Sequence, residues 1–415
     1  MREMRDSGVE WIGEIPKDWN CCKQKYRFTL INGRAFKDNE FEEDGTYRIL
    51  RVGNLFSNPV WYSSSLELEP DKYCEKGDLI YAWSMSYGPY IWNEEKVIYH
   101  YHIWKTKLVS DMDKMFSYYY LQALTESIKS QTHETTMGFV TMGIMNNSYI
   151  AYPRNIKEQK KISNYLDAKC SKIDEIIEKQ QAIIEKLKEY KFSIITEAVT
   201  KGINPDVELK DSTIDMCEQI PVHWSISQNR YLFSLRDEKN YKPLEEVRLL
   251  SLYTDLGVFP HGEQEERGNK AVKAEGYKVV YENDIVVNII LAWMGAIGRS
   301  AYDGVTSPAY DIYKPTENVC SRYYHYLYRT KPFSAECYKY GRGIMAMRWR
   351  TYSSEFKSIK VPVPPYIEQC QIADYLDSKC EMLDKTIADR NKAIEKLQEY
   401  KKSLIYEVVT GIKEV

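Results

Sequence analysis

The segment 339–360 (KYGRGIMAMRWRTYSSEFKSIK), called here the basic segment, mixes cations and aromatic rings in a pattern typical of a nucleic-acid contact. It carries six lysines and arginines against one acid, Glu355. Both cations neutralise phosphates, and arginine can also pair with two acceptor atoms of a guanine. The predicted DNA contacts in this segment are Arg342, Arg348, Arg350 and Lys357. The alternative is a solvated basic loop.

A second candidate contact lies in the sequence TYRILRVGNL, where Arg48, Arg51 and Asn54 occupy one predicted strand and loop. Acidic residues between 38 and 44 dilute the positive charge of this patch. Trp83 and Trp293 share a Trp-x4-Gly spacing, each after an apolar run. Their loops either reach a DNA groove or anchor the indole in a core, and the second interpretation is favoured.

Sequence signatures of catalysis are missing. The chain has no Gly-x4-Gly-Lys-Ser/Thr loop for nucleotide phosphates, and neither Phe-x-Gly-x-Gly nor Asn-Pro-Pro-Tyr/Phe, the signatures of base methyltransferases. No Cys-x-x-Cys pair or Cys/His cluster has zinc spacing. His100 and His102 could share one strand face, but a third ligand is not evident, so we expect a structural role for both. The residues therefore favour a binding protein without a metal, cofactor or reaction of its own.

The composition is that of a globular protein with two or three domains, since 415 residues contain 43% hydrophobic and 28% charged residues. A net charge of −3 argues against a uniformly basic coat but allows local basic faces. No apolar run is long enough to span a membrane, and the N-terminus leads into no secretory signal. Together with nine cysteines, an odd number, this predicts a cytoplasmic protein with reduced thiols.

The chain is a tandem repeat. Residues 158–200 align with 368–410 at a constant offset of 210 without gaps, and 22 of the 43 positions are identical. Upstream, the motif Ile-Pro-x-x-Trp occurs at 15–19 and again at 220–224. The order is therefore body, helix, body, helix. We expect body 1 at 1–157, a central helix at 158–203, body 2 at 204–366 and a C-terminal helix at 367–415.

The repeated 43-residue unit is predicted to be helical, because it lacks Pro and Gly and its apolar residues recur every three and four positions. One such helix would expose its apolar stripe, whereas two copies in one chain can bury each other as an antiparallel coiled coil. Gln180 and Arg390 occupy equivalent stripe positions, where a polar side chain either fixes the register or only reaches past it to water. The expected seam residues are Ile177, Ile184, Leu187, Ile194, Ile387, Ile394, Leu397 and Leu404.

The two bodies are predicted to be mixed α/β structures. Short β-type runs at 47–52, 278–281 and 284–287 alternate with turn residues, and 116–128 and 321–328 have helical patterns. The bodies differ from each other while the helices do not. This contrast predicts two recognition modules of different specificity on one scaffold.

The whole chain resembles the specificity (S) subunit of Type I restriction–modification systems. The resemblance rests on the Ile-Pro-x-x-Trp motif, Arg51-Val52-Gly53-Asn54-Leu55, Gly77-Asp78-Leu79-Ile80, residues 288–298 (NIILAWMGAIG), Ser307-Pro308-Ala309-Tyr310, the proline-rich lead 361–365, and above all the duplicated helix. The lead into the first helix, Tyr152-Pro153-Arg154-Asn155, departs from this pattern because it lacks the double proline. That departure leaves the end of body 1 less well defined.

The resemblance implies that each body is a target recognition domain reading one half of a split, asymmetric site on double-stranded DNA. The paired helices would set the gap between the half-sites. The partners would be two methyltransferase (M) subunits, which bind S-adenosylmethionine and modify adenine, and two restriction (R) subunits, which use ATP and Mg. The chain itself would be non-catalytic and bind no cofactor and no membrane. The alternatives are a coiled-coil scaffold that binds proteins without DNA, and a fused methyltransferase–specificity enzyme, which the missing motifs oppose.

Overall fold

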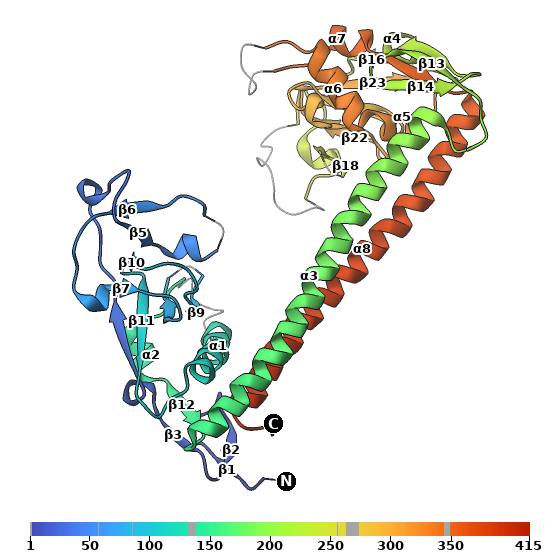
Figure 1. Cartoon of the computed structure of the whole chain (residues 1–415). Coiled ribbons are helices and arrows are strands. Elements are labelled where there is room, and N and C mark those ends of the chain that lie inside the picture. Colours follow the sequence, from blue (N-terminus) through green and yellow to red (C-terminus); the bar gives the residue numbers. More distant parts are fainter. Residues whose placement is uncertain are drawn as a thin grey trace. The chain divides into compact units, whose positions relative to one another are not determined.

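The computed structural model describes residues 2–56, 58–84, 86–131, 138–254, 256–262, 274–343 and 349–415 (Figure 1). The chain forms two compact units. Unit 1 consists of Met1–Gln181 together with Asn391–Val415, and unit 2 consists of Ala182–Arg390. Each unit therefore combines one body of the repeat with a part of both long helices.

Body 1 contains two four-stranded sheets, with the strand orders β4-β11-β8-β9 and β6-β5-β10-β7. The first is antiparallel throughout, and in the second β5 and β10 pair in parallel. Two smaller antiparallel pairs are β1 with β2 and β3 with β12. The strands are β1 (Met4–Asp6), β2 (Glu14–Pro16), β3 (Asn20–Lys23), β4 (Phe28–Asn32), β5 (Tyr47–Leu50), β6 (Tyr62–Ser64), β7 (Tyr73–Cys74), β8 (Leu79–Ala82), β9 (Gly88–Ile91), β10 (Val97–Tyr99), β11 (Ile103–Leu108) and β12 (Tyr149–Tyr152).

Body 2 repeats this topology. Its larger sheet has the order β16-β23-β20-β21, and an isolated parallel bridge between Leu249 and Val305 joins the pairs β17–β18 and β19–β22, as β5 and β10 are joined in body 1. The pairs β13–β14 and β15–β24 complete the match. The strands are β13 (Leu209–Ile214), β14 (Cys217–Pro221), β15 (Ser225–Gln228), β16 (Phe233–Arg236), β17 (Leu250–Tyr253), β18 (Gly257–Pro260), β19 (Lys278–Val280), β20 (Ile285–Asn288), β21 (Ile297–Arg299), β22 (Gly304–Thr306), β23 (Tyr310–Pro315) and β24 (Lys360–Val363).

The helices of the bodies cover these sheets. Their bounds are α1 (Lys114–Gln131), α2 (Met142–Asn147), α4 (Asn229–Leu232), α5 (Ser321–Tyr328), α6 (Lys331–Tyr340) and α7 (Ser353–Ser358). Every residue of β8 and of β20 is buried, because these strands lie inside their sheets and are covered on both faces. The predicted strand at 47–52 ends at Leu50, since Val52 begins the short 3₁₀ helix Val52–Leu55.

The two long helices are α3 (Ile156–Lys201) and α8 (Tyr366–Val409), the long green and red ribbons of Figure 1. In unit 1, the Lys401 ammonium lies 2.7 Å from the Asp174 carboxylate. In unit 2, the Lys191 ammonium lies 2.6 Å from Asp384. The numbers of each pair add up to 575, so α3 and α8 pair in the antiparallel sense, and the offset of 210 exchanges one ion pair for the other. The fold is thus a pseudo-twofold tandem repeat on an antiparallel coiled coil.

The expected seam residues all lie in the interior or at its margin. Gln180 and Arg390 are half-buried, which is compatible with either role expected for them. Ile177, Ile184, Ile394 and Leu404 are buried, whereas Leu187, Ile194, Ile387 and Leu397 are half-buried.

The N-terminal end of each long helix is fixed by a buried glutamine. The amide of Gln159 donates to the carbonyl oxygens of Pro153 and Asp111 at 2.9 and 3.0 Å. The amide of Gln369 donates to the carbonyl oxygen of Pro364 at 2.9 Å and accepts from the main-chain N–H of Cys320 at the same distance. The segment that leads into α3 therefore holds its glutamine in the same way as the segment before α8, although it has one proline instead of the double proline.

The C-terminal end of each long helix lies on a tryptophan of an Ile-Pro-x-x-Trp motif. Gly411 follows α8 with a φ of +79° and lies against Trp19, and Gly202 follows α3 with a φ of +82° and lies against Trp224. Such left-handed φ values are typical of a glycine that ends a helix. Both indoles are buried, so each body is closed by the end of one long helix.

The nine cysteines are all free. Among the described residues, no group of three or more His, Cys, Asp and Glu side chains is arranged to hold a metal ion. Within the same ranges, no helix has the length and apolar character needed to cross a bilayer.

Candidate nucleic-acid interface

Arg342 and Arg350 face each other within the basic segment. Each main-chain N–H donates to the carbonyl oxygen of the other residue at 2.9 Å. The Arg342 side chain is 72% exposed and pairs with Glu355, the buried acid of the segment. Arg350 is half-buried, and Lys357 is half-buried on α7. The structure thus brings two of the predicted arginines together and places the lysine on the helix that follows.

Arg348, the remaining predicted contact of the basic segment, lies outside the described residues.

An aromatic cluster stands beside these arginines. Trp349 stacks on Tyr338 with ring centroids 4.8 Å apart and an interplanar angle of 20°, and Trp293 meets the same tyrosine edge-on at 5.8 Å. A side chain at Gly341 would collide with the Trp349 indole, so the glycine is needed for this packing. Met294, next to Trp293, is exposed. The Trp293 loop therefore anchors on one side in the core and presents apolar surface on the other.

Arg48, the first DNA contact predicted in body 1, is paired with acidic side chains of the protein itself. The Arg48 guanidinium lies 3.0 Å from the Glu94 carboxylate and 2.7 Å from Glu95, and it covers the Trp61 ring at 4.4 Å. Exposed ion pairs of this kind contribute only about 0.2–1 kcal/mol each. A phosphate could compete for Arg48, but the two carboxylates reduce its attraction.

Asn54 and Arg51 have different roles. The Asn54 amide group accepts from the main-chain N–H of Arg51 at 3.1 Å and donates to the carbonyl oxygens of Asn58 and Val60, so it holds its own loop together. Arg51 is exposed and lies over the Tyr62 ring at 5.1 Å. Of the three DNA contacts predicted in body 1, Arg51 is therefore the one whose side chain faces the solvent.

A group of aromatic side chains near Arg51 was not identified as a site from the sequence. Trp83, in the loop after β8, meets the rings of Tyr101 and His102 at centroid distances of 6.1 and 4.9 Å, and His100 lies 4.8 Å from His102. The sequence did contain a signal for this group, the run His-Tyr-His directly after an apolar strand. A structural role was expected for the two histidines of that run.

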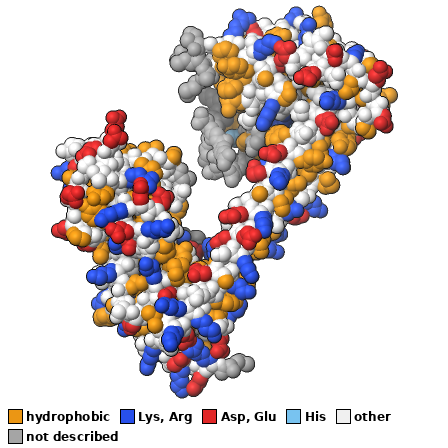
Figure 2. Space-filling view, viewed as in Figure 1, with side chains coloured by type: hydrophobic (Ala, Val, Ile, Leu, Met, Phe, Trp, Pro, Cys, Tyr) orange, Lys and Arg blue, Asp and Glu red, His pale blue; other side chains and the backbone are white. Residues whose placement is uncertain are grey.

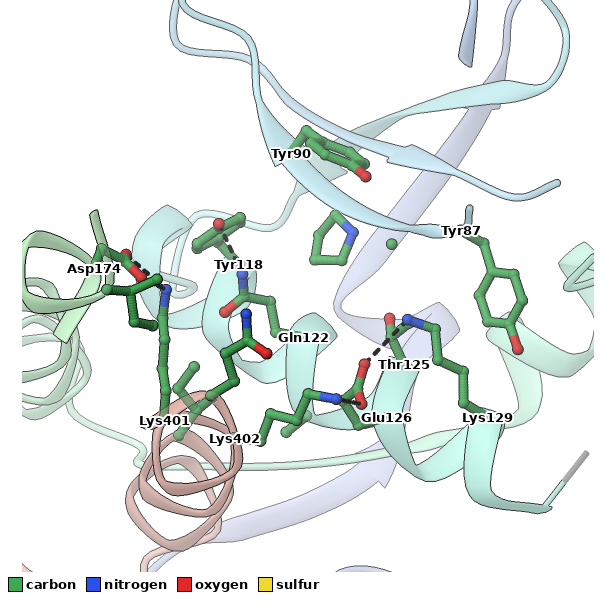
Figure 3. A pocket seen from close by; sticks show the side chains of 16 residues that line it. Tyr87, Tyr90, Tyr118, Gln122, Thr125, Glu126, Lys129, Asp174, Lys401 and Lys402 are labelled. Carbon is green, nitrogen blue, oxygen red and sulfur yellow. Dashed lines mark hydrogen bonds and ion pairs between the residues drawn. The ribbon is translucent and has the colours of Figure 1, made fainter. Parts of the chain in front are cut away.

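A cavity of about 460 Å³ in unit 1 lies between β9, α1 and the two long helices (Figure 3). Its wall contains Glu126, which pairs with Lys402 at 2.8 Å and with Lys129 at 3.1 Å. The Asp174–Lys401 pair forms another part of the wall. Burial raises the pKa of Glu126, but the hydrogen bonds and charges of Lys402 and Lys129 outweigh it and hold the pKa below its ordinary value. The Glu126–Lys402 pair attaches body 1 to α8.

Each body is also tied to the long helix that follows it. In unit 1 the Tyr119 hydroxyl donates to Asp167 on α3 at 2.7 Å. In unit 2 the Tyr326 hydroxyl donates to Asp377 on α8, also at 2.7 Å, and Arg322 pairs with the same carboxylate at 2.8 Å. Asp167 and Asp377 are equivalent in the repeat, so the scaffold uses one attachment point twice.

The charged side chains do not form a uniform basic surface. Figure 2 shows lysines and arginines interspersed with acids over the face in view, as the net charge of −3 predicts. A nucleic-acid contact therefore has to be local.

Comparison with known families finds one description that matches most of the chain. Residues 16–190 and 231–396 each match the Type I restriction modification DNA specificity domain.

Two curated relatives are similar to parts of the chain. The specificity subunit of the Type I restriction enzyme EcoBI from Escherichia coli is 23% identical over 238 residues, which are 54% of this chain and 48% of that protein. The specificity subunit of the Type I restriction enzyme MjaVIII from Methanocaldococcus jannaschii is 27% identical over 199 residues, which are 43% of this chain and 45% of that protein. The chain thus spans about half the length of the curated relatives it matches.

The fold also has a match among solved structures. A chain from work titled as the structural basis of complex assembly and conformational transition of the type I R-M system has a TM-score of 0.68 at 11% identity, covering 95% of this chain and 98% of that one. At this identity the likeness concerns the fold.

Proposed function

Because the chain belongs to the family of type I restriction–modification DNA specificity domains, we propose that it selects the DNA sequence on which a type I restriction–modification complex acts. The observation that carries this proposal is the double family match on two bodies of the same topology. The sheets agree strand by strand, whereas the loops at their ends carry different residues. Two different readers on one scaffold fit a two-part, asymmetric site on double-stranded DNA.

The recognition domains of this proposal are body 1 (1–157) and body 2 (204–366). Their proposed DNA contacts are Arg51, with Arg48 in a secondary role because of its carboxylate partners, and Arg342, Arg350 and Lys357 of the basic segment, to which Arg348 also belongs. Asn54 supports the loop that carries Arg51. The antiparallel helices expected at 158–203 and 367–415, which the structure has as α3 (Ile156–Lys201) and α8 (Tyr366–Val409), act as the spacer that sets the gap between the half-sites.

The chain supplies sequence choice and no chemistry in this scheme. S-adenosylmethionine is bound by two methyltransferase subunits, and ATP and Mg by two restriction subunits. Such an assembly acts on chromosomal and foreign DNA in the cytoplasm.

The helix surface supports the binding of one partner twice. At five positions that are exposed in both copies the residues are identical, although packing does not require it. At exposed positions in the preceding stretch, such as 171, 172, 175, 178 and 179, the copies all differ. A repeated surface on diverged bodies suits two copies of one methyltransferase subunit. The identical positions are Glu185, Lys186, Glu189, Tyr190 and Ser193 on α3, and Glu395, Lys396, Glu399, Tyr400 and Ser403 on α8.

The proposed docking surface is testable through its two tyrosines, which are 56% and 54% exposed. Replacing Tyr190 and Tyr400 together by Ala should lower the number of methyltransferase subunits bound, measured by the mass of the purified complex. The control is the pair Ile176→Ala and Met382→Ala, which changes two exposed apolar residues where the copies differ. Equal binding by both double variants would contradict this assignment.

The function itself is tested by mapping adenine methylation in the host genome. Deletion of the gene for this chain should abolish methylation at one two-part asymmetric sequence, and a plasmid copy should restore it. Unchanged methylation would refute the proposal. A protein scaffold without DNA binding is separated by a gel shift over a range of salt concentrations, because phosphate contacts must weaken steeply as salt rises.

A further inference from the structure

A row of aromatic rings leads from the core of body 1 to its surface. Tyr81 and Trp104 are opposite each other on β8 and β11, are both buried, and stack with ring centroids 5.8 Å apart. Trp83 stacks on the other side of Trp104 at 5.9 Å. Beyond Trp83 come His102 at 4.9 Å and Tyr101 at 6.1 Å, and Tyr101 is 39% exposed. The exposed end of the row therefore rests on a rigid base.

The turn that carries this exposed end is fixed by its main chain. The N–H of Ile103 donates to the carbonyl oxygen of His100 at 2.9 Å, and the N–H of Tyr101 donates to that of Arg34 at 3.1 Å. The Trp83 indole N–H donates to the Tyr101 carbonyl oxygen at 2.7 Å. A side chain at Gly33 would lie 2.3 Å from the carbonyl oxygen of Tyr99, so the neighbouring strand holds the turn closely. Because the turn is already held in place, it would lose little conformational entropy when a partner binds to it.

The side chains of the turn are polar at their tips and uncharged. Burial, together with the nearby His102 and Arg51, lowers the pKa of His100 to about 4. The pKa of His102 is also below its ordinary value, through burial and Arg51. Each neutral imidazole offers one hydrogen-bond donor and one acceptor, and the Tyr101 hydroxyl can do both. Such groups suit the edges of bases better than phosphates, while the neighbouring Arg51 supplies the positive charge.

The equivalent turn in body 2 has the same position between its strands but different residues. The turn between β22 and β23 reads Ser307-Pro308-Ala309, and the loop between β20 and β21 carries Trp293 and the exposed Met294. A turn that keeps its position but changes its side chains is expected where the two bodies read different DNA sequences.

We propose that the turn His100–Tyr101–His102, together with Arg51, reads bases of the half-site recognised by body 1. This inference rests on the proposed function and adds the residues that determine its specificity in one half-site. Tyr101 and the two imidazoles contact base edges in the major groove, and Arg51 contacts a guanine or the adjoining phosphate.

The test uses the full chain in complex with its methyltransferase partners and a set of duplexes that carry single base changes in either half-site. Tyr101→Ala and His102→Ala should each reduce discrimination among changes in one half-site about tenfold and leave the other half-site as in the wild type. Tyr101→Phe, which removes only the hydroxyl, should reduce it less. The control is Tyr26→Ala, which removes a more exposed tyrosine of the same body and should change neither half-site.

The outcomes distinguish a failure of the proposed function from a failure of base reading by this turn. If the wild-type complex shows no preference for any sequence, the proposed function fails. If the wild type discriminates and the Tyr101 and His102 variants do so equally well, the turn does not read bases. Equal weakening on every duplex would also overturn base reading, and thermal unfolding of each variant shows whether the fold is retained.

Discussion

The helices can be lengthened in register, and the spacing of the DNA half-sites should follow. The pairs Asp174–Lys401 and Lys191–Asp384 place the centre of the coiled coil between residues 182 and 183 of α3 and between 392 and 393 of α8. One heptad inserted at both points keeps each ion pair within its own unit and lengthens each helix by about 10.5 Å. Along B-DNA this distance corresponds to about three base pairs, which also rotate the duplex by about 100°.

We expect the preferred gap to lengthen by between about one and about three base pairs, because the duplex must absorb the added rotation by twisting. The assay is methylation of a library in which the two mapped half-sites are separated by gaps of different length. A heptad in α3 alone breaks the pairing on one side of the centre, so this control should lose stability without giving a defined new gap. An unchanged gap in the doubly lengthened chain, or altered half-sites, would refute the spacer hypothesis.

Gly411→Ala should destabilise unit 1 by at least about 1 kcal/mol, because the φ of Gly411 is +79° and the new Cβ would lie 2.4 Å from the Pro16 ring. Thermal unfolding measures this loss of stability. The control is Gly138→Ala, because the space around Gly138 is open. A double-mutant cycle of Glu126→Gln and Lys402→Ala should give a coupling of about 0.2–1 kcal/mol, and no coupling would mean that the contact adds no stability. Burial and two nearby arginines lower the pKa of His325 to about 3. The unfolded chain binds this proton near pH 6.5, so stability should fall as the pH drops from 6.5 towards 3, and His325→Gln should flatten that part of the curve; an unchanged curve would contradict it.

The long helices could be predicted from the sequence because their signal is local and occurs twice. Apolar residues every three and four positions determine a helical stripe, and a second copy provides its partner. The antiparallel sense then follows from the chain returning after body 2. The helical patterns at 116–128 and 321–328 were equally local, and they correspond to α1 and α5.

The candidate contacts were harder to predict because they depend on residues far apart in the chain. Arg48 is paired with Glu94 and Glu95, more than 45 residues away, and no local pattern announces that neutralisation. The aromatic row depends on the register of β8 against β11, which places Trp104 opposite Tyr81. Strand register is set by tertiary packing, so the sequence could indicate the aromatic residues but not their alignment.

The composition of the two units has a consequence for biosynthesis. Unit 2 is one continuous stretch, Ala182–Arg390, whereas unit 1 needs Asn391–Val415 to join residues made much earlier. On the ribosome, body 1 must therefore wait without the contact between Trp19 and Gly411 while the whole of unit 2 emerges, until the end of α8 arrives. A nascent chain that stops before these residues leaves unit 1 unclosed, which exposes incomplete products to chaperones and proteases before they can compete for partners.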